Sequence, residues 1–350
     1  MNKFIEIDGT KIGKDFPPYI IAELSANHNG DINRAYRIME EAKAAGASAI
    51  KLQSYTHETI TIDSYNEEFM VRGGLWDGKS LYELYKEAHM PWEWHELLFE
   101  KAKELGITIF SSPFDFTAVD LLESLNSPAY KIASFEILDL PLIARVAQTG
   151  KPMIISTGMA NEQEIKDAVD TAKNNGCSEL IVLQCVSGYP APAEQYNLRT
   201  IPDLAERFDV LSGLSDHTLD NASAVASVAL GACLIEKHVT LDRNGGGADD
   251  SFSLEPMELA QLCKDTRIAW SSLGKVNYER TEAEKGNVKF RRSLYVVKDI
   301  KLGEEFTQTN VKSIRPGFGI PPKYFTEVLG AKAKCAIKKG TPLKFELIVQ

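Results

Sequence analysis

Short apolar runs alternate with amphipathic segments from residue 19 to about residue 270, and this alternation is the feature that most restricts the fold. The amphipathic segments, such as 32–46, 95–106 and 161–176, carry apolar residues at helical spacing. Eight strand–helix units predict the α/β class and a closed (β/α)8 TIM barrel rather than an open doubly wound sheet. The runs predicted as strands are YIIAEL (19–24), SAIKLQ (48–53), ITIFSS (107–112), AYKIAS (129–134), MIIST (153–157), LIVLQCV (180–186), DVLSGLS (209–215) and CLIEKH (233–238).

Two segments interrupt this alternation. Residues 54–94 form a long insert after the second strand, and loops of this length in a compact domain are usually lids or binding elements. After about residue 285, strand-like runs such as RRSLYVVKDI return, together with KLGEEF and KKGTPL turns. The sequence therefore predicts a barrel domain over 1–270, a linker over 271–286 and a small β-rich domain over 287–350.

Composition and charge exclude several classes of protein. The 350 residues are 44% hydrophobic and 25% charged, as is typical of a soluble globular protein. No apolar run approaches the roughly 18 to 20 residues of a membrane helix, and no GxGxxG motif follows the first strand. The net charge of −10 argues against nucleic acid and acidic membranes as partners. Scattered cysteines without CxxC spacing, and a start that lacks a secretory h-region, predict a cytoplasmic protein with reduced thiols.

Polar residues stand at the ends of the predicted strands, where barrel enzymes carry their sites. Lys51 and Lys131 lie inside apolar strands, and a charge there is costly unless it faces a polar site. Ser112, Ser134 and Ser156 end neighbouring strands. Fixed positive charge beside hydroxyl donors predicts a phosphate site, which would allow this acidic chain to bind an anion. Two alternatives remain open, namely lysines that extend to solvent and the Schiff-base lysine of an aldolase.

Two histidines follow the last two predicted strands, in GLSDHTLDN (213–221) and EKHVTLDRNGGGADD (236–250). Because neighbouring strands of a barrel end side by side, His217 and His238 could hold one metal ion. Without cysteines they make a poor zinc site, and they suit Mn²⁺ or a Mg²⁺-like ion that keeps oxygen ligands. The alternative is two buried, hydrogen-bonded histidines. The histidines of the insert and of the following helix are expected to be structural or exposed: His57, His89 and His95.

Carboxylates near the strand ends are candidates for proton transfer. Glu23 ends the first strand, which adjoins the last strand in a closed barrel and so brings Glu23 near His238. A helix cap or an ion pair is the alternative role for Glu23. Glu136 is a weaker acid/base candidate. Further polar groups expected to contact a substrate are Gln53, Tyr189 and Asp249.

A family resemblance runs through essentially the whole chain. The ordered motifs IIAELSANHNG, AIKLQ, FSSPF, AYKIASFE, IISTGM, CVSGYPAP, GLSDHTLDN and EKHVTLDRNGGGADDSFSLEP resemble those of the bacterial sialic acid synthases. SIRPGFGIPP and KKGTPL resemble the antifreeze-like (SAF) domain of the same family. The resemblance implies an enzyme that condenses phosphoenolpyruvate with an open-chain N-acetylated hexosamine, releasing phosphate and forming a nine-carbon acid. It also implies a divalent metal, Mn²⁺ foremost with Mg²⁺ or Co²⁺ as substitutes, and no organic cofactor.

The resemblance further implies roles for individual residues. His217 and His238 would bind the metal ion, and Ser215 would help to bind the carboxylate of phosphoenolpyruvate. In this family the SAF domain is exchanged between subunits, which implies a domain-swapped homodimer in which Arg315 contacts the N-acetyl group of the partner's sugar. The phosphate would contact Lys51, Ser112, Lys131, Ser134 and Ser156, and the sugar would contact Glu23, Gln53, Phe114, Tyr189 and Asp249.

Within the family, the insert LWDGKSLYELYKEAHMPWEW and the loop GGGADDSF most resemble the pseudaminic acid synthases. N-acetylneuraminate synthases commonly carry Asn-Ile where this chain has Ser187 and Gly188, and PGPD where it has GGAD. Both places are expected to face the sugar, so a 6-deoxy diacetamido sugar fits better than N-acetylmannosamine. N-acetylneuraminate and legionaminate synthase remain alternatives. A Schiff-base aldolase and a non-catalytic carbohydrate-binding protein are more remote ones.

Overall fold

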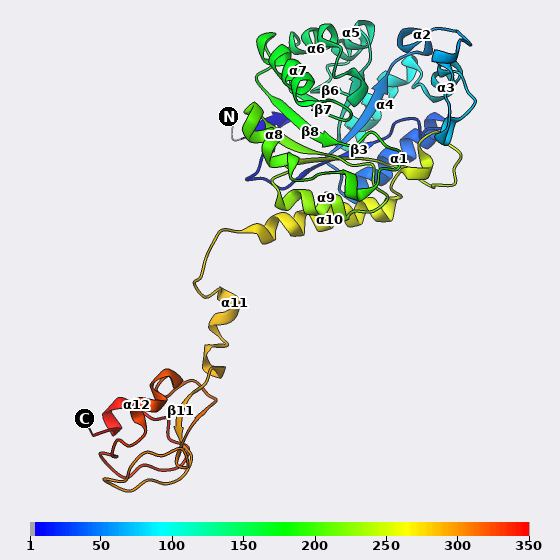
Figure 1. Cartoon of the computed structure of the whole chain (residues 1–350). Coiled ribbons are helices and arrows are strands. Elements are labelled where there is room, and N and C mark those ends of the chain that lie inside the picture. The colour runs from blue at the N-terminus through cyan, green and yellow to red at the C-terminus, as the bar shows by residue number, and fades with distance from the viewer. Residues whose placement is uncertain (1–3, 350) are drawn as a thin grey trace. The chain divides into compact units, whose positions relative to one another are not determined.

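A computed structural model describes residues 4–349, which divide into two compact units that part between Gly274 and Lys275 (Figure 1). The first unit is a ring of parallel strands surrounded by helices. The second unit is much smaller and holds a two-stranded antiparallel sheet. Within residues 4–349, no helix is both long and apolar enough to cross a membrane.

Eight parallel strands close into a barrel in the first unit, which confirms the predicted TIM barrel. Each strand pairs with the next in sequence, and β10 pairs with β3 to close the ring. All eight strands are almost wholly buried, as strands covered on both faces must be. The strands are β3 (Tyr19–Glu23), β4 (Ala49–Ser54), β5 (Thr108–Pro113), β6 (Tyr130–Ile132), β7 (Met153–Ser156), β8 (Leu180–Cys185), β9 (Leu211–Ser215) and β10 (Leu234–His238).

Helices cover the outside of this barrel. Alternation along β4 turns Ile50 and Leu52 outward, where they join a core with Ile38 and Met39 of α1. The residue between them, Lys51, therefore points into the barrel. The helices are α1 (Ile32–Ala45), α4 (Trp92–Leu105), α5 (Phe116–Ser124), α6 (Leu140–Ala147), α7 (Glu162–Asn174), α8 (Thr200–Phe208), α9 (Ala222–Ala229) and α10 (Pro256–Leu273).

An N-terminal hairpin, which the sequence pattern did not predict, seals one end of the barrel. Its strands are β1 (Ile5–Ile7) and β2 (Thr10–Ile12), paired antiparallel. Ile5, Ile7 and Ile12 are buried in one cluster with the first residues of several barrel strands, including Tyr19 of β3 and Leu234 of β10. This end of the barrel is therefore closed by apolar side chains, and the polar site must open at the other end.

The insert after β4 has its own structure. β4 already ends at Ser54 and α4 begins at Trp92, so the predicted limits of 54–94 overlap both elements. The ring of Tyr55 packs edge-on against Phe114 at 5.1 Å, which fixes the base of the insert to the end of β5. The insert comprises α2 (His57–Ile60), α3 (Leu81–Ala88) and the 3₁₀ turns η1 (Glu67–Phe69) and η2 (Gly74–Trp76).

The C-terminal unit has a small core of its own. α10 continues to Leu273, so the predicted linker of 271–286 begins three residues too early. Leu294, Val296 and Phe306 lie in a separate buried cluster of this unit. Its elements are α11 (Glu282–Lys285), η6 (Val288–Phe290), β11 (Ser293–Val296), β12 (Val311–Ile314), η7 (Pro322–Tyr324), α12 (Phe325–Val328) and η8 (Phe345–Leu347).

Candidate active site

Buried charges from non-neighbouring strands meet inside the barrel. Lys51 comes from β4, Lys131 from β6 and Glu236 from β10. The Nζ atom of Lys131 lies 3.2 Å from Oε1 of Glu236, and Nζ of Lys51 lies 3.6 Å from the same oxygen. Because these strands are not adjacent in the ring, the contacts cross the interior of the barrel.

A second carboxylate completes this ion cluster. Oε2 of Glu23, the last residue of β3, lies 2.6 Å from Nζ of Lys51. Lys51 also donates a hydrogen bond of 3.2 Å to Oγ of Ser112 on β5. The side chains of Glu23 and Lys51 are 0% and 4% exposed, so two ammonium and two carboxylate groups share a site with almost no solvent. We call Glu23, Lys51, Lys131 and Glu236 the ion cluster.

The members of the ion cluster differ in how readily they hold a proton. Burial raises the pKa of the Glu23 carboxyl above its ordinary value, even though Lys51 lies beside it. Burial alone would also raise the pKa of Glu236, but the ammonium groups of Lys131 and Lys51 hold it below its usual range. Burial lowers the pKa of Lys131. Glu23 is therefore the carboxyl of this cluster best suited to carry a proton.

Serine hydroxyls surround the ion cluster. Ser156 at the end of β7 is buried, and its Oγ has no hydrogen-bond partner among residues 4–349. Ser215 on β9 donates a 3.4 Å hydrogen bond to Oε1 of Glu236. Ser134, which begins the short turn η3 (Ser134–Glu136), accepts a 3.1 Å hydrogen bond from the backbone N–H of Gly158. Ammonium groups together with these hydroxyls, of which that of Ser156 is unpaired within residues 4–349, form a site that can bind an anion.

Ser187 lies beside this group of hydroxyls. A Cβ atom on Gly158 would lie 2.2 Å from Oγ of Ser187 and 2.7 Å from Oγ of Ser134. Only glycine allows these two hydroxyls to approach the backbone so closely. The Oγ of Ser187 is buried and has no hydrogen-bond partner within residues 4–349.

The two predicted histidines meet edge-on, His217 just beyond the end of β9 and His238 at the end of β10. Their ring centroids lie 5.4 Å apart. Nδ1 of His217 donates a 2.8 Å hydrogen bond to the carbonyl of Val186, because a carbonyl oxygen only accepts. Nδ1 of His238 lies 3.5 Å from Oδ2 of Asp249. Nδ1 of each ring thus lies near an oxygen acceptor, which suits Nε2 of each ring to bind a metal ion through its lone pair.

This donor set fits a metal ion that keeps most of its ligands from water and substrate. Among residues 4–349, no three His, Cys, Asp or Glu side chains are grouped to hold a metal by themselves. The orientation of both Nδ1 atoms toward oxygen is the arrangement that usually supports a metal-binding histidine. Two imidazoles without a thiolate suit Mn²⁺ or a similar ion better than structural zinc.

Aromatic rings line the histidine side of the site. The ring of Tyr189 lies 4.5 Å from that of His217 and 5.1 Å from that of Phe252. Phe252 is buried and packs against His238 at 5.1 Å. Asp249 receives a short hydrogen bond from Oγ of Ser25. The site therefore has a charged half, the ion cluster with its serines, and an aromatic half around the histidines.

Glu136 lies two residues beyond Ser134, at the end of η3. Burial raises the pKa of its carboxyl to about 7. Its Oε2 atom is buried without a hydrogen-bond partner in the part of the chain that the structure describes. Glu136 can therefore change protonation state near neutral pH, which keeps it as an acid/base candidate.

Among residues 4–349, the side chains of two predicted sugar contacts, Gln53 and Phe114, make no hydrogen bond or ion pair with either half. Phe114 packs on Tyr55 of the insert, and Gln53 is half-buried at the end of β4. Arg315 is exposed and follows β12 in the separate C-terminal unit. As expected, His57, His89 and His95 have structural surroundings: the rings of His57 and His89 meet edge-on in the insert, while His95 is buried, with its Nε2 2.8 Å from Oγ of Ser54.

Lys237 is a buried positive charge that the sequence pattern did not single out. It lies between Glu236 and His238 on β10, so it faces the opposite side of the strand. Its Nζ donates hydrogen bonds to Oδ2 of Asp216 at 3.0 Å, to the carbonyl of Thr218 at 2.9 Å and to that of Asp220 at 2.7 Å. Lys237 thus ties the segment that carries His217 to the strand that carries His238.

The glycine-rich loop after β10 is held mainly by structural contacts. Asp250, 1% exposed, accepts hydrogen bonds from Nη2 of Arg34 at 3.1 Å and from the N–H of Gly247 at 2.7 Å. A Cβ on Gly247 would lie 2.0 Å from Oδ1 of Asn29. The glycines therefore allow close packing, and Asp249 is the carboxylate of this loop that lies beside His238.

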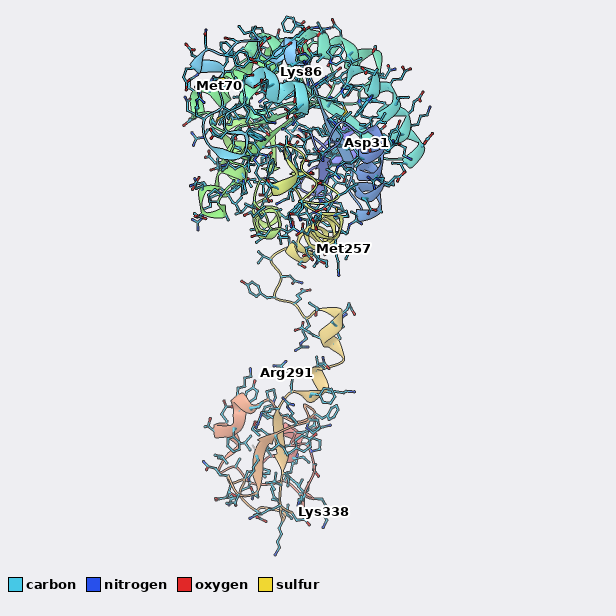
Figure 2. The ribbon with its side chains drawn as sticks, turned by 90° about the vertical axis from the view of Figure 1, so that its right-hand side faces the viewer. Asp31, Met70, Lys86, Met257, Arg291 and Lys338 are labelled. Carbon is cyan, nitrogen blue, oxygen red and sulfur yellow. The ribbon has the colours of Figure 1, made fainter. Side chains whose placement is uncertain are left out.

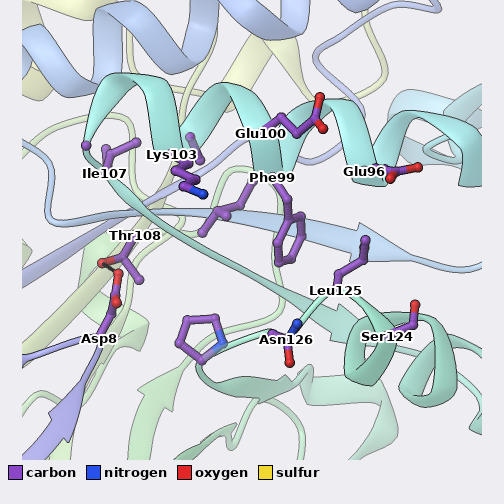
Figure 3. Close-up of a pocket in the computed structure, with 14 residues that line it drawn as sticks. Asp8, Glu96, Phe99, Glu100, Lys103, Ile107, Thr108, Ser124, Leu125 and Asn126 are labelled. Carbon is purple, nitrogen blue, oxygen red and sulfur yellow. Dashed lines mark hydrogen bonds between the residues drawn. The ribbon is translucent and has the colours of Figure 1, made fainter.

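A surface hollow at the opposite end of the barrel is unrelated to this site. It is lined by Glu100 and Lys103 of α4, by Thr108 at the start of β5 and by Asp8 of the N-terminal hairpin (Figure 3). Oγ1 of Thr108 donates a 3.0 Å hydrogen bond to Asp8. None of the predicted site residues lines this hollow.

Comparison with known proteins assigns the chain to a family. Residues 38–278 match the model of the NeuB family, and residues 291–349 match that of the SAF domain. The chain belongs to the NeuB family.

Individual relatives cover nearly the whole chain. A pseudaminic acid synthase from Campylobacter jejuni is 45% identical and covers 93% of this chain and 95% of its own. An N,N'-diacetyllegionaminic acid synthase from the same organism is 38% identical and covers 89% of this chain and 94% of its own. The crystal structure of an N-acetylneuraminic acid synthetase from Leptospira borgpetersenii in complex with citrate is 34% identical, with a TM-score of 0.73, over 81% of this chain and 95% of that one.

Proposed function

We propose that this chain is a pseudaminic acid synthase. It condenses phosphoenolpyruvate with 2,4-diacetamido-2,4,6-trideoxy-β-L-altrose and water to give pseudaminic acid and phosphate. The observation that carries the proposal is the meeting of two buried lysines, several serine hydroxyls and two histidines at one barrel mouth. The higher identity to a pseudaminic than to a legionaminic acid synthase of one organism favours this sugar.

The charged half suits phosphoenolpyruvate. Its phosphate would take the ammonium groups of Lys51 and Lys131, which Glu236 now holds within 3.6 Å. The free hydroxyl of Ser156 and those of Ser112 and Ser134 would add hydrogen bonds. Ser215 would help to bind the carboxylate of phosphoenolpyruvate. Charge-assisted hydrogen bonds of this kind stabilise a leaving phosphate without moving, because the barrel strands fix the donors.

The aromatic half suits the sugar. Tyr189 and Asp249 would contact it, with Gln53 and Phe114 at the rim. We assign a divalent ion, Mn²⁺ first, to Nε2 of His217 and His238, where it would supply Lewis-acid polarisation of the sugar carbonyl. The hydrogen bond of His217 to Val186 keeps its ring in the orientation that this assignment requires.

The bonds change in a defined order. The methylene carbon of phosphoenolpyruvate bonds to the aldehyde carbon of the open-chain sugar, and positive charge builds at the carbon that bears the phosphate oxygen. Water adds to that carbon, and the tetrahedral intermediate breaks its C–O bond to release phosphate. Glu23, whose pKa burial raises, would move the proton between water and the new hydroxyl, with Glu136 as the second candidate.

Isotope labelling tests this reaction directly. Phosphoenolpyruvate labelled with ¹⁸O at the bridging oxygen should transfer the label to phosphate, as mass spectrometry can show. Label retained in the sugar acid would overturn the C–O pathway. Phosphate release with a panel of acetamido hexoses, with and without EDTA and Mn²⁺, identifies the sugar and the metal requirement together.

The lowered pKa of buried Lys131 favours a second candidate, a Schiff-base aldolase. Borohydride treatment in the presence of the keto-acid substrate and EDTA would then attach that substrate to Lys131. The proposed synthase gives no such adduct, so peptide mapping separates the two reactions.

Assembly and location are also proposed. We infer a domain-swapped homodimer, from the family resemblance, in which exposed Arg315 reaches the sugar bound by the partner subunit. The five cysteines are all free thiols, which agrees with a cytoplasmic enzyme. Light scattering should give twice the mass of the 38.8 kDa chain, and a monomer would exclude the shared site.

A further inference from the structure

Trp76 joins the insert to the loop after β10. It ends the turn η2, and its indole Nε1 donates a 3.1 Å hydrogen bond to the carbonyl of Ala248. The insert follows β4, and the loop follows β10, with β3 between these strands in the barrel. The contact therefore spans the mouth above β3. The insert is marked by Met70 and Lys86 in Figure 2.

The residue that Trp76 holds is next to a site carboxylate. Ala248 directly precedes Asp249, whose Oδ2 lies 3.5 Å from Nδ1 of His238 and accepts from Ser25. On the other side of Asp249, Asp250 is anchored in the body of the barrel by Arg34. The position of Asp249 thus depends on one anchor in the barrel and one in the insert.

The ring of Trp76 extends the aromatic half of the site. Its centroid lies 6.2 Å from that of Tyr189, which in turn lies 4.5 Å from His217. Trp76 is half-buried, so part of the indole surface remains open. An indole presents a large apolar surface with a single polar atom, and here that atom is already bonded to Ala248.

We propose that Trp76 is a specificity-determining residue that latches the insert over the aromatic half and offers its ring to the C6 methyl group of a 6-deoxy acetamido sugar. This inference rests on the proposed function. The reacting C1 end of the sugar lies at the histidines, so the far end of the open chain extends toward the next rings, Tyr189 and Trp76. A hydroxyl at C6 would lose water against the ring and gain no hydrogen bond from the indole, because its N–H is already bonded to Ala248.

Two substitutions separate the apolar ring of Trp76 from its hydrogen bond to Ala248, which holds the insert over the site. Trp76→Ala removes both, whereas Trp76→Phe keeps an apolar ring and removes the N–H donor. Trp92→Phe is the matched control, because Nε1 of Trp92 has no hydrogen-bond partner within residues 4–349. The first measurement is the ratio of kcat/KM for the 6-deoxy sugar to that for its 6-hydroxy analogue. We expect Trp76→Ala to lower this ratio about tenfold, with KM for phosphoenolpyruvate within twofold of the unchanged chain.

The second measurement does not depend on catalysis. Arg72 lies in the insert and its side chain is 57% exposed, so trypsin cleavage there reports release of the insert. We expect Trp76→Phe and Trp76→Ala to be cut several times faster than Trp92→Phe. Equal cleavage rates would overturn the latch, even if no sugar is turned over.

The outcomes remain distinct from those of the proposed function. If the unchanged chain releases no phosphate with any acetamido hexose, the proposed function fails, while the cleavage rates still decide the latch. If the unchanged chain is active and Trp76→Ala keeps the same ratio between the two sugars, the specificity role is wrong. An equal fall in kcat/KM with both sugars, together with a rise in KM for phosphoenolpyruvate, would show a general structural role and also overturn it.

Discussion

The two halves of the barrel mouth are built differently. The charged half stands on the strands themselves, since Glu23, Lys51, Lys131 and Glu236 all belong to β3, β4, β6 and β10. The aromatic half depends more on loops, because Tyr189 and Asp249 lie between elements and Trp76 ends the turn η2 of the insert, although His238 ends β10. Side chains on paired strands are fixed by the whole barrel, whereas loops can change without disturbing it. A rigid charged half suits phosphoenolpyruvate, which stays the same, and a loop-built aromatic half suits a sugar that differs between relatives.

The largest expected effect comes from breaking the charged half. Lys51→Met leaves Glu23 and Glu236 buried beside one fewer ammonium group. Removing one partner of a buried pair usually costs about 3–5 kcal/mol, so urea unfolding at pH 8 should show a loss of this size. The double variant Lys51→Met/Glu23→Gln should recover most of the stability and none of the activity. If Lys51→Met alone is as stable as the unchanged chain, Lys51 does not stabilise the ion cluster by the amount expected.

Replacing a histidine should affect the reaction more than the fold. Polarisation by a metal is worth several kcal/mol, so His217→Ala should lower kcat at least about 100-fold. Its loss of unfolding free energy should be smaller than that of Lys51→Met. His89→Ala, in the insert, is the control and should keep full activity. Equal activity of the two variants, or unchanged Mn²⁺ binding in electron paramagnetic resonance, would contradict the metal assignment.

Glu136 gives the charged half a pH dependence. Its pKa is raised to about 7 in the folded chain, so folded Glu136 keeps its proton while unfolded Glu136 ionises near 4.5. The resulting stability is present below pH 4.5 and is lost as the pH rises through 7. Glu136→Gln should therefore gain up to about 3 kcal/mol relative to the unchanged chain between pH 5 and pH 8. If the urea midpoints of Glu136→Gln and of the unchanged chain differ by the same amount at pH 5 and at pH 8, the raised pKa of Glu136 is disproved.

The smallest effect is expected in the aromatic half. Ser25→Ala removes the hydroxyl that donates to Asp249. One hydrogen bond contributes about 1 kcal/mol, so KM for the sugar should rise about fivefold, with KM for phosphoenolpyruvate unchanged. Ser227→Ala, which removes a buried hydrogen bond on α9, serves as the control. A change in both KM values would show that the two halves are not independent.

The sequence allowed the barrel to be predicted because each strand is an apolar run with a polar end. The boundaries were less exact. The run 129–134 became β6 over Tyr130–Ile132, because Ser134 turns into η3 to meet the N–H of Gly158. The hairpin of β1 and β2 escaped prediction, since strands of three residues show no measurable period.

Site residues could be predicted where their position at the end of a strand was visible in the sequence. Glu236 could have been found, because it shares the inward face of β10 with His238 at a spacing of two. Lys237 and Trp76 could not be assigned, since their partners Asp216 and Ala248 are set by strand register and by the path of the insert. The predicted roles of Phe114 and Arg315 rest on resemblance alone.

The pairing of β3 with β10 has a consequence for how the chain is made. The N–H of Val239 bonds to the carbonyl of Glu23, so the first strand of the barrel, which also pairs with β4, gains its second neighbour only when the last strand has been synthesised. Until then, the nascent chain exposes two unpaired strand edges. The carboxylate of Glu23 can meet Lys51 of β4 but not yet Glu236 and His238 of β10. A chain that ends before residue 234 therefore lacks both the closed barrel and the complete ion cluster, because β10 supplies Glu236.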